Sequence, residues 1–218
     1  MFLALTYILF LLTFMYTYKT YKILLTFTGS GENPEHFRNR KGFFSLNVQM
    51  LCDAEMRIMD VVARWPGSVH DQRIFNNSRV MSRFEANEFP GSIILGDGGY
   101  ENRPYLVTPL SNPQSLGERL YNESQIRSRC MVERTFGVLK KRFPILAIGM
   151  RCSLDLVMAV IHATTILHNI AIHERIELPE PEVAVDTMED TCISSLELAP
   201  VGDDRIRDNL IKNYFSKL

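Results

Sequence analysis

Cysteine is scarce in this sequence, and its spacing fits no metal-binding or disulfide motif. The 218 residues contain four cysteines, with no C-x-x-C pair and no even framework: Cys52, Cys130, Cys152 and Cys192. This spacing argues against a zinc ribbon and against a disulfide scaffold, and it favours a reduced intracellular protein. The sequence also lacks an internal repeat.

Charge is absent from the start of the chain, where the first charged residue is Lys19 and the first acidic residue is Glu32. Eighteen uncharged, mostly apolar residues approach the length that crosses a bilayer. A cleaved signal peptide fits poorly, because no basic region precedes the apolar run and no clear small-residue cleavage site follows it. Residues 1–18 are interpreted as a membrane anchor, as a buried strand or helix, or as a segment foreign to the ancestral domain. As an anchor, they would leave the body of the protein in the cytoplasm.

Net charge is also nearly absent, at −1, but the two parts of the chain differ. Residues 1–175 carry 20 basic and 15 acidic side chains, a net of +5, and residues 176–218 carry 4 and 10, a net of −6. A basic body with an acidic tail suits a polyanionic ligand such as DNA, although solvated protein faces often look the same. We expect the acidic tail to be loosely packed.

The pattern of apolar residues predicts an α/β layer fold. Expected strands are 43–50, 57–64, 92–96 and 105–108, of which the first two form a hairpin. Expected helices are 69–80 after Ser68, 123–142 after a loop at 111–122, and a longer helix from Ser153. The apolar stripe of the second helix contains Val132, Phe136, Leu139 and Phe143. The corresponding face of the third contains Val157, Ile161, Thr164, Leu167, His168 and Ala171.

One expected strand, I-I-L-G, ends on Asp97 and two glycines. Ligands in such sheets gather beyond the carboxyl ends of strands, and the two glycines leave room for a nucleic-acid backbone. Glu133, in the following helix, would supply a second hard oxygen ligand for a divalent cation. The competing interpretation is a surface ion pair of Glu133 with Arg129 or Lys140, a contact of little energetic weight.

Four motifs in this order resemble the PIF/Harbinger transposase family, including the nucleases that animals derived from it. They are F-R-N-R-K-G-F-F-S-L-N-V-Q (37–49), W-P-G-S-V-H-D (65–71), L-G-D-G-G-Y (95–100) and V-E-R-T-F-G-V-L-K-K-R-F (132–143). L-H-N at 167–169 agrees with the closing helix of the family. The resemblance implies a ribonuclease-H-like mixed sheet with flanking helices. It also implies cleavage of DNA by Mg²⁺ or Mn²⁺ held by an Asp-Asp-Glu triad, with Asp97 as the second Asp and Glu133 as the Glu.

The sequence departs from the family at the first Asp, which the family places on its first strand, shortly before the R-N-R-K-G stretch. Residues 17–28 contain no acidic residue, and the first Asp of the chain, Asp53, falls in the hairpin. We therefore expect the first strand and one metal ligand to be missing or replaced, and cleavage to be impaired. The expected organisation is an apolar segment at 1–30, a DDE-type nuclease core at 31–175 and the acidic tail at 176–218.

Other candidate residues carry less weight. Asp71 could assist the site, but an Asp at the start of a helix also complements the helix dipole. The expected phosphate contacts are Arg129 and the run Lys140-Lys141-Arg142, although a solvated helix end explains this run as well. His162, His168 and His173 do not share a helical face, which argues against a zinc site.

Two functions remain open at this point. The chain is either an impaired metal-dependent endonuclease or an inactive transposase domain that binds DNA or protein. The resemblance implies DNA as a partner, a separate DNA-binding protein that supplies specificity, and a location in the nucleus and cytoplasm. Membrane association through residues 1–18 is the competing expectation.

Overall fold

The computed structural model describes residues 15–24, 34–38, 42, 44–179 and 202–218. At its centre is a five-stranded sheet with the order β3-β2-β1-β4-β5. The strands are β1 (Met15–Leu24), β2 (Ser45–Cys52), β3 (Ile58–Pro66), β4 (Ile93–Leu95) and β5 (Leu106–Val107). The first three strands are antiparallel neighbours, and β1, β4 and β5 run parallel. The expected α/β class and all four expected strands are confirmed.

The centre of the sheet is occupied, whereas the sequence left open whether the first strand is missing or replaced by the apolar N-terminal segment. β1 fills this place, pairing with β2 from Thr17↔Cys52 to Leu24↔Ser45 and with β4 through Met15↔Ile93 to Thr17↔Leu95. The strand comes from the segment expected to lie outside the core, and its sequence, M-Y-T-Y-K-T-Y-K-I-L, contains no carboxylate. The sheet therefore keeps a central strand that carries no acidic residue. Residues 1–14 of the apolar N-terminal segment lie outside the described residues.

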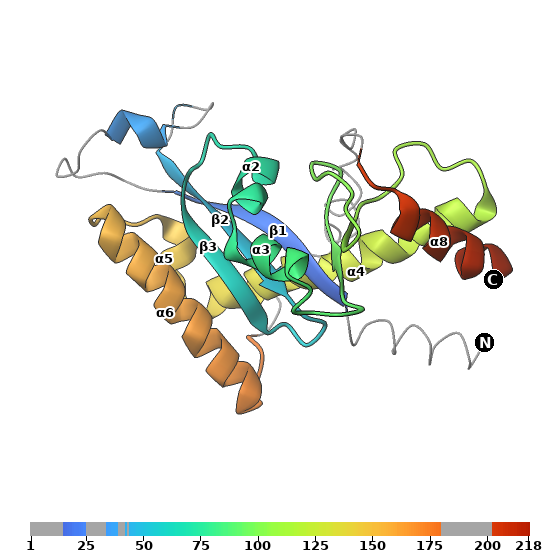
Figure 1. Ribbon diagram of the computed structural model, residues 1–218. Helices are drawn as coiled ribbons and strands as arrows, with labels where there is room; N and C mark the ends of the chain where they lie inside the picture. The colour runs from blue at the N-terminus through green and yellow to red at the C-terminus, as the bar shows by residue number, and fades with distance from the viewer. Residues whose placement is uncertain (1–14, 25–33, 39–41, 43, 180–201) are drawn as a thin grey trace.

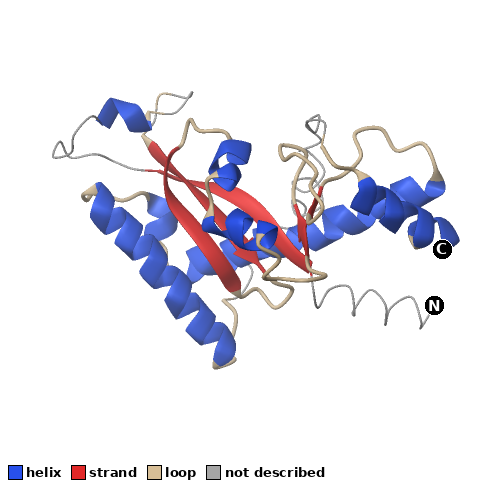
Figure 2. Cartoon of the chain, viewed as in Figure 1, coloured by secondary structure: helices blue, strands red, loops and turns tan. Residues whose placement is uncertain are grey.

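Two layers of helices cover the sheet (Figures 1 and 2). On one face lie α4 (Leu116–Arg142), α5 (Ile145–Ile148) and α6 (Leu154–His173). Alternate residues of β2, including Leu46, Val48 and Met50, pack against these helices in one buried cluster. The helical side of the cluster includes Val132, Phe136, Leu139, Val157 and Ile161, with Phe143 at its margin. Both predicted apolar stripes therefore face the core, except that Leu167 is 51% exposed.

The opposite face is covered by two short helices, α2 (Asp71–Asn76) and α3 (Arg79–Glu85), where the sequence predicted a single helix over 69–80. The break follows from Ser78, whose side chain accepts a hydrogen bond from the Met81 amide and caps the second helix. Phe75, Val80, Phe84, Ile94 and Leu106 form the second buried cluster, together with Leu51 and Tyr100.

Helix α4 begins earlier than predicted, at Leu116 inside the expected loop 111–122. Ser115 and Glu118 form a capping box: the Ser115 hydroxyl accepts from the Glu118 amide, and the Glu118 carboxylate accepts from the Ser115 amide. This is a strong start signal. The early start lengthens α4 to 27 residues, enough to cross the whole sheet.

Part of the expected acidic tail is ordered against the start of α4. Residues 202–218 contain α8 (Arg205–Asn213) and the 3-10 turn η2 (Phe215–Lys217). The rings of Tyr121 and Phe215 pack edge to face at 5.6 Å, and Asn102 donates a hydrogen bond of 2.7 Å to Asp204. Among the described cysteines, Cys52 and Cys152 are free thiols, and Cys130 is disulfide-bonded, which the sequence did not predict.

Candidate functional site

Asp97 lies directly beyond the carboxyl end of β4, in a tight turn that holds its backbone. The Gly99 amide donates to Oδ1 of Asp97 at 3.1 Å, and the Tyr100 amide donates to the Asp97 carbonyl at 3.1 Å. The side chain is half-buried, and its Oδ2 forms no hydrogen bond with another described residue. One carboxylate oxygen is thus used for positioning, and the other remains available to a ligand.

Tyr100 anchors this turn to the sheet. Its ring is fully buried, and its hydroxyl accepts a hydrogen bond of 2.8 Å from the side-chain amide of Gln49 on β2. The same amide donates to the Asp71 carbonyl at 3.2 Å, and the Tyr100 ring packs edge to face on Phe75 at 6.0 Å. A buried side chain of the sheet thereby connects the Asp97 turn to the start of α2.

Gly96 allows Tyr100 to take this position. A Cβ atom at residue 96 would lie 3.0 Å from Cδ2 of Tyr100 and 3.2 Å from Cδ2 of Leu106. A side chain at residue 96 would therefore crowd the buried Tyr100 and Leu106.

Glu133 lies on α4, between two contacts that fix the position of the helix over the sheet. Toward the N-terminus, Tyr121 donates to the Thr108 carbonyl after β5, and toward the C-terminus Phe136 packs in the β2 cluster. Helix α4 packs against β1, β2 and β4. With a rise of about 1.5 Å per residue, Glu133 lies nearer along the helix to the Phe136 contact with the β2 cluster than to the Tyr121 contact after β5. Its side chain is half-buried.

β1 is the neighbour of β4 in the sheet, and its register is defined by the Thr17↔Leu95 pair. Asp97 comes two residues after Leu95, and Lys19 comes two residues after Thr17. Lys19 is therefore the residue of β1 that adjoins Asp97 when the parallel ladder is continued. Within the described residues, no three Asp, Glu, His or Cys side chains gather as a metal site. The close approach of Asp97 and Glu133 stays a prediction.

The expected phosphate contacts differ in their accessibility. Arg129 is only 4% exposed, which does not suit contact with DNA, whereas Lys141 is exposed. Lys140 is half-buried, and burial lowers the pKa of its ammonium group. Arg142 donates to the Ile176 and Glu177 carbonyls at 3.0 and 3.4 Å, so its guanidinium connects the end of α4 to the chain after α6.

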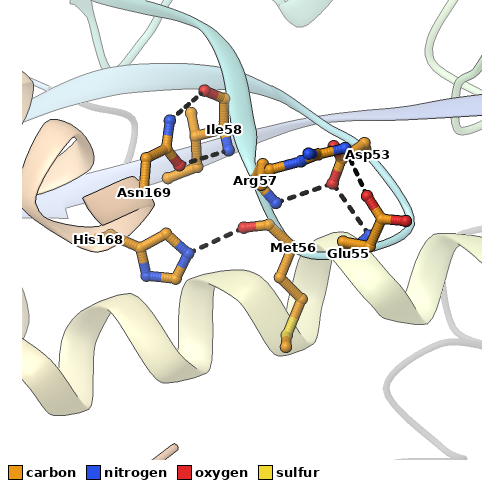
Figure 3. Close-up of polar contacts among 7 residues, drawn as sticks. All are labelled: Asp53, Glu55, Met56, Arg57, Ile58, His168 and Asn169. Carbon is orange, nitrogen blue, oxygen red and sulfur yellow. Dashed lines mark hydrogen bonds and ion pairs between the residues drawn. The ribbon is translucent and has the colours of Figure 1, made fainter. Parts of the chain in front are cut away.

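The other candidate acids and histidines have structural partners. Asp71 is the half-buried first residue of α2. Asp53 closes the β2–β3 turn by accepting from the Glu55 and Arg57 amides and pairing with the Arg57 guanidinium at 2.6 Å (Figure 3). His168 is fully buried, and its Nε2 lies 2.9 Å from the Met56 carbonyl. Asp53 and His168 therefore hold the turn between β2 and β3 in place, and these contacts do not indicate a metal site.

Gln49 and Tyr100 are the positioning residues that the sequence did not reveal as such. Ser45, Asn47 and Gln49 alternate with apolar residues along β2, a pattern typical of a solvent-facing strand side. All three are nevertheless completely buried. The polar side of β2 binds backbone groups of the segment before α2, as when Asn47 donates to the Val69 carbonyl at 2.7 Å.

The sheet, its covering helices and the acidic residue after β4 define the class of protein, and the comparison of sequences agrees. The family model described as DDE superfamily endonuclease matches residues 25–169. The chain therefore belongs to the DDE superfamily endonuclease family. The matched region begins directly after β1.

The individual relatives confirm the resemblance to the Harbinger-derived nucleases. Proteins named "Putative nuclease HARBI1" are 32% identical over 183 residues in Bos taurus and 33% identical over 191 residues in Homo sapiens. Each match covers 82% of this chain and 52% of the relative. "Protein ALP1-like" from Arabidopsis thaliana is 28% identical over 144 residues, covering 59% of this chain and 36% of that protein. The chain thus spans about half the length of the first two relatives. No solved structure matches it.

Proposed function

We propose that the chain is a metal-dependent endonuclease domain for DNA whose cleavage is impaired by the lack of a carboxylate on β1. The observation that carries the proposal is the composition of the central strand, M-Y-T-Y-K-T-Y-K-I-L, beside the anchored turn of Asp97. Membership of the DDE endonuclease family supports the nuclease activity.

Asp97 and Glu133 are the residues that would hold the divalent cation, Mg²⁺ or Mn²⁺. Both are half-buried carboxylates on rigid elements, the hard oxygen donors that these ions prefer. When bound, the cation activates water and stabilises the charge that develops on a phosphodiester. The protein itself orients Asp97 through the Gly99 and Tyr100 amides and presents exposed cationic side chains such as Lys141 to the DNA backbone.

The impairment follows from the ligand count. Two carboxylates offer a divalent cation fewer hard oxygen ligands than the three of the family's triad, so the metal would be held more weakly. We therefore expect weak metal binding and a cleavage rate reduced by orders of magnitude.

The experiment supplies the absent carboxylate at the register of Asp97. Lys19→Asp should increase the nicking of plasmid DNA in Mg²⁺ or Mn²⁺, whereas Lys22→Asp, the same substitution three residues further along β1, should not. Thermal denaturation of both variants controls for folding. Adding Glu133→Gln to Lys19→Asp should abolish the gain and excludes contaminating nuclease. Strong Glu133-dependent nicking by the unaltered chain would contradict the impairment, and no gain from Lys19→Asp would contradict the assigned register.

The second candidate function is an inactive domain that binds DNA or protein, favoured by the same absence of a carboxylate from β1. In this function a separate DNA-binding protein supplies sequence specificity, in the nucleus and cytoplasm. DNA binding would then be electrostatic, and Lys141→Ala should reduce the slope of affinity against salt by about one unit. Metal-independent binding without nicking, in the chain and in Lys19→Asp alike, would favour this function over the first.

A further inference from the structure

A groove lies along the edge of the sheet at which β4 begins. It consists of two hollows of about 630 Å³ and about 470 Å³, which share the half-buried side chains of Ile93, the first residue of β4, and Ile206, on α8. Its walls include five further aromatic or apolar side chains: Phe84, Phe89, Tyr105, Leu210 and Tyr214. We call this surface the β4-edge groove.

Helix α8 presents a second apolar side to this groove. Arg207 and Ile211 are buried on the side that packs in the domain. Ile206, Leu210 and Tyr214 are half-buried, follow one another at a spacing of four, and line the groove. Residues at this spacing lie along one side of a helix. The groove is thus a largely apolar surface that the described residues do not fill.

The chain enters the sheet at this groove. Met15, the first residue of β1, pairs with Ile93, and the two strands are parallel. The residue before Met15 therefore reaches the sheet at the end where β4 begins, since consecutive Cα atoms are only about 3.8 Å apart. Because Ile93 lines both hollows, residues 1–14 are attached directly beside the groove.

The composition of residues 1–14 matches the walls of the groove. The segment reads M-F-L-A-L-T-Y-I-L-F-L-L-T-F and contains no charged side chain. Burial of apolar surface is the main favourable contribution to an association of this kind. A tethered segment also competes well against a separate partner, because a short connection gives it an effective concentration in the millimolar range. Attachment and composition together select this segment as the occupant.

We propose that residues 1–14 occupy the β4-edge groove and pack between α8 and the aromatic side chains around Phe84. The three interpretations of the apolar start of the chain are then reduced to one, a buried part of the fold. The contact would hold the start of β1 beside β4 and connect α8 to the central strand. It does not depend on nuclease activity, because Asp97 follows the opposite end of β4.

Photo-cross-linking in the full chain tests where the segment lies. A benzophenone-bearing phenylalanine in place of Phe10 should, on irradiation, become attached to α8 or to the walls near Phe84 and Tyr105 of the same chain, as mapped by mass spectrometry. The same group in place of Ile148, which is 80% exposed on α5, is the control and should not label these walls. Figure 1 shows α5 and α8 on opposite sides of the molecule. Absence of groove cross-links from position 10 would overturn the proposal, and so would products of doubled mass, which would assign the groove to a second copy.

A double-mutant cycle in the full chain tests whether the contact contributes to stability. Phe10→Ala and Ile206→Ala should each lower the urea midpoint of unfolding. The two together should lower it by less than the sum of the separate shifts, because both remove the same contact. Ile148→Ala is the matched control for Ile206→Ala and should combine additively with Phe10→Ala. Additive shifts for Phe10→Ala and Ile206→Ala would overturn the proposal.

Sedimentation with phosphatidylcholine vesicles tests the membrane interpretation of the same segment. The full chain should remain in the supernatant, because the groove covers its apolar segment. Recovery of the chain with the vesicles, abolished by Phe10→Asp, would overturn the proposal and assign residues 1–14 to a lipid surface.

Discussion

Asn169 on α6 exchanges two hydrogen bonds with the backbone of Ile58, the first residue of β3: its side-chain amide donates to the Ile58 carbonyl, and its carbonyl oxygen accepts from the Ile58 amide, both at 2.8 Å (Figure 3). β3 is the edge strand of the described sheet, so on its outer side these backbone groups pair with no other described strand. The carboxamide of Asn169 takes the place of a neighbouring strand there. The L-H-N motif of the closing helix is thus a structural clamp on the hairpin.

Asn169→Ala should lower the free energy of unfolding by about 2–4 kcal/mol, because it leaves a donor and an acceptor of Ile58 without partners in a part of the fold that is mostly buried. Urea denaturation measures the change. Asn209→Ala, at an exposed position of α8, is the matched control and should change the stability by less than about 0.5 kcal/mol. Equal effects of the two substitutions would show that the clamp contributes nothing.

His168 should make stability depend on pH. Burial lowers the pKa of its imidazole, and the Met56 carbonyl opposes this shift in part. The unfolded chain then binds more protons than the folded chain between the lowered folded pKa and the ordinary value of about 6.5. The free energy of unfolding should therefore fall as the pH decreases from about 6.5 and level off below the folded pKa.

His168→Gln should remove most of this slope, since glutamine can still donate to the Met56 carbonyl but does not titrate. The measurement is the urea midpoint as a function of pH. His162→Gln, at an exposed position of α6, serves as the control and should keep the slope of the unaltered chain. An unchanged slope in His168→Gln would assign the pH dependence to other groups.

The sequence predicted the parts of the fold that depend on local pattern. The hairpin, both long helices and the core stripe through Val132, Phe136 and Leu139 follow from apolar spacing, which the structure confirms. Two features were not predicted, because they depend on packing between segments that are far apart in the sequence. Part of the N-terminal segment became the central strand through pairing with β2 and β4. Gln49 lies on an apparent solvent face but is buried, because its hydrogen-bonding partner Tyr100 lies far along the chain.

The sequence predicted only those parts of the candidate site that lie within its motifs. Asp97 follows the end of a strand by two residues, and Glu133 lies on the helix that crosses the sheet, as the L-G-D-G-G-Y and V-E-R-T-F patterns indicate. Arg129 lies four residues before Glu133 and so shares its side of α4 by spacing. Arg129 is nevertheless buried, because packing of the helix in the fold covers this position. The spacing of residues along a long amphipathic helix does not by itself show whether a given charged side chain is buried or exposed.

The same substitution at two glycines should have opposite effects. Gly67, in W-P-G-S, donates its amide to the Ser45 carbonyl at 2.7 Å, and a Cβ there would lie 1.9 Å from the buried Ser45 hydroxyl. Gly67→Ala should therefore cost about 1–3 kcal/mol of stability by overpacking. Gly137, on the exposed side of α4, has no atom within 4 Å of such a Cβ. Gly137→Ala should stabilise the chain by about 0.5–1 kcal/mol, because alanine is the better helix former.

The urea midpoints of the two alanine variants, measured with the unaltered chain, give both signs in one experiment. A stabilising Gly67→Ala would mean that Ser45 and the W-P-G-S turn can move apart without loss. A destabilising Gly137→Ala would mean that the surface of α4 at this residue is covered in solution.

The last prediction concerns β1, which gives the sheet its continuity. It pairs with β2 over Thr17–Leu24 and with β4 over Met15–Thr17, so among the described strands it alone joins the two halves of the sheet. Removing residues 1–24 should leave the inner edges of β2 and β4 without partners, and unpaired backbone groups in a core are costly. We expect this shortened chain to lose cooperative unfolding and to expose apolar surface. Removal of residues 1–14 alone retains β1 and should preserve a cooperative transition. Urea denaturation followed by circular dichroism, with dye binding to exposed apolar surface, compares the two. If the chain without residues 1–24 unfolds as cooperatively as the chain without residues 1–14, β1 is dispensable and the sheet closes without it.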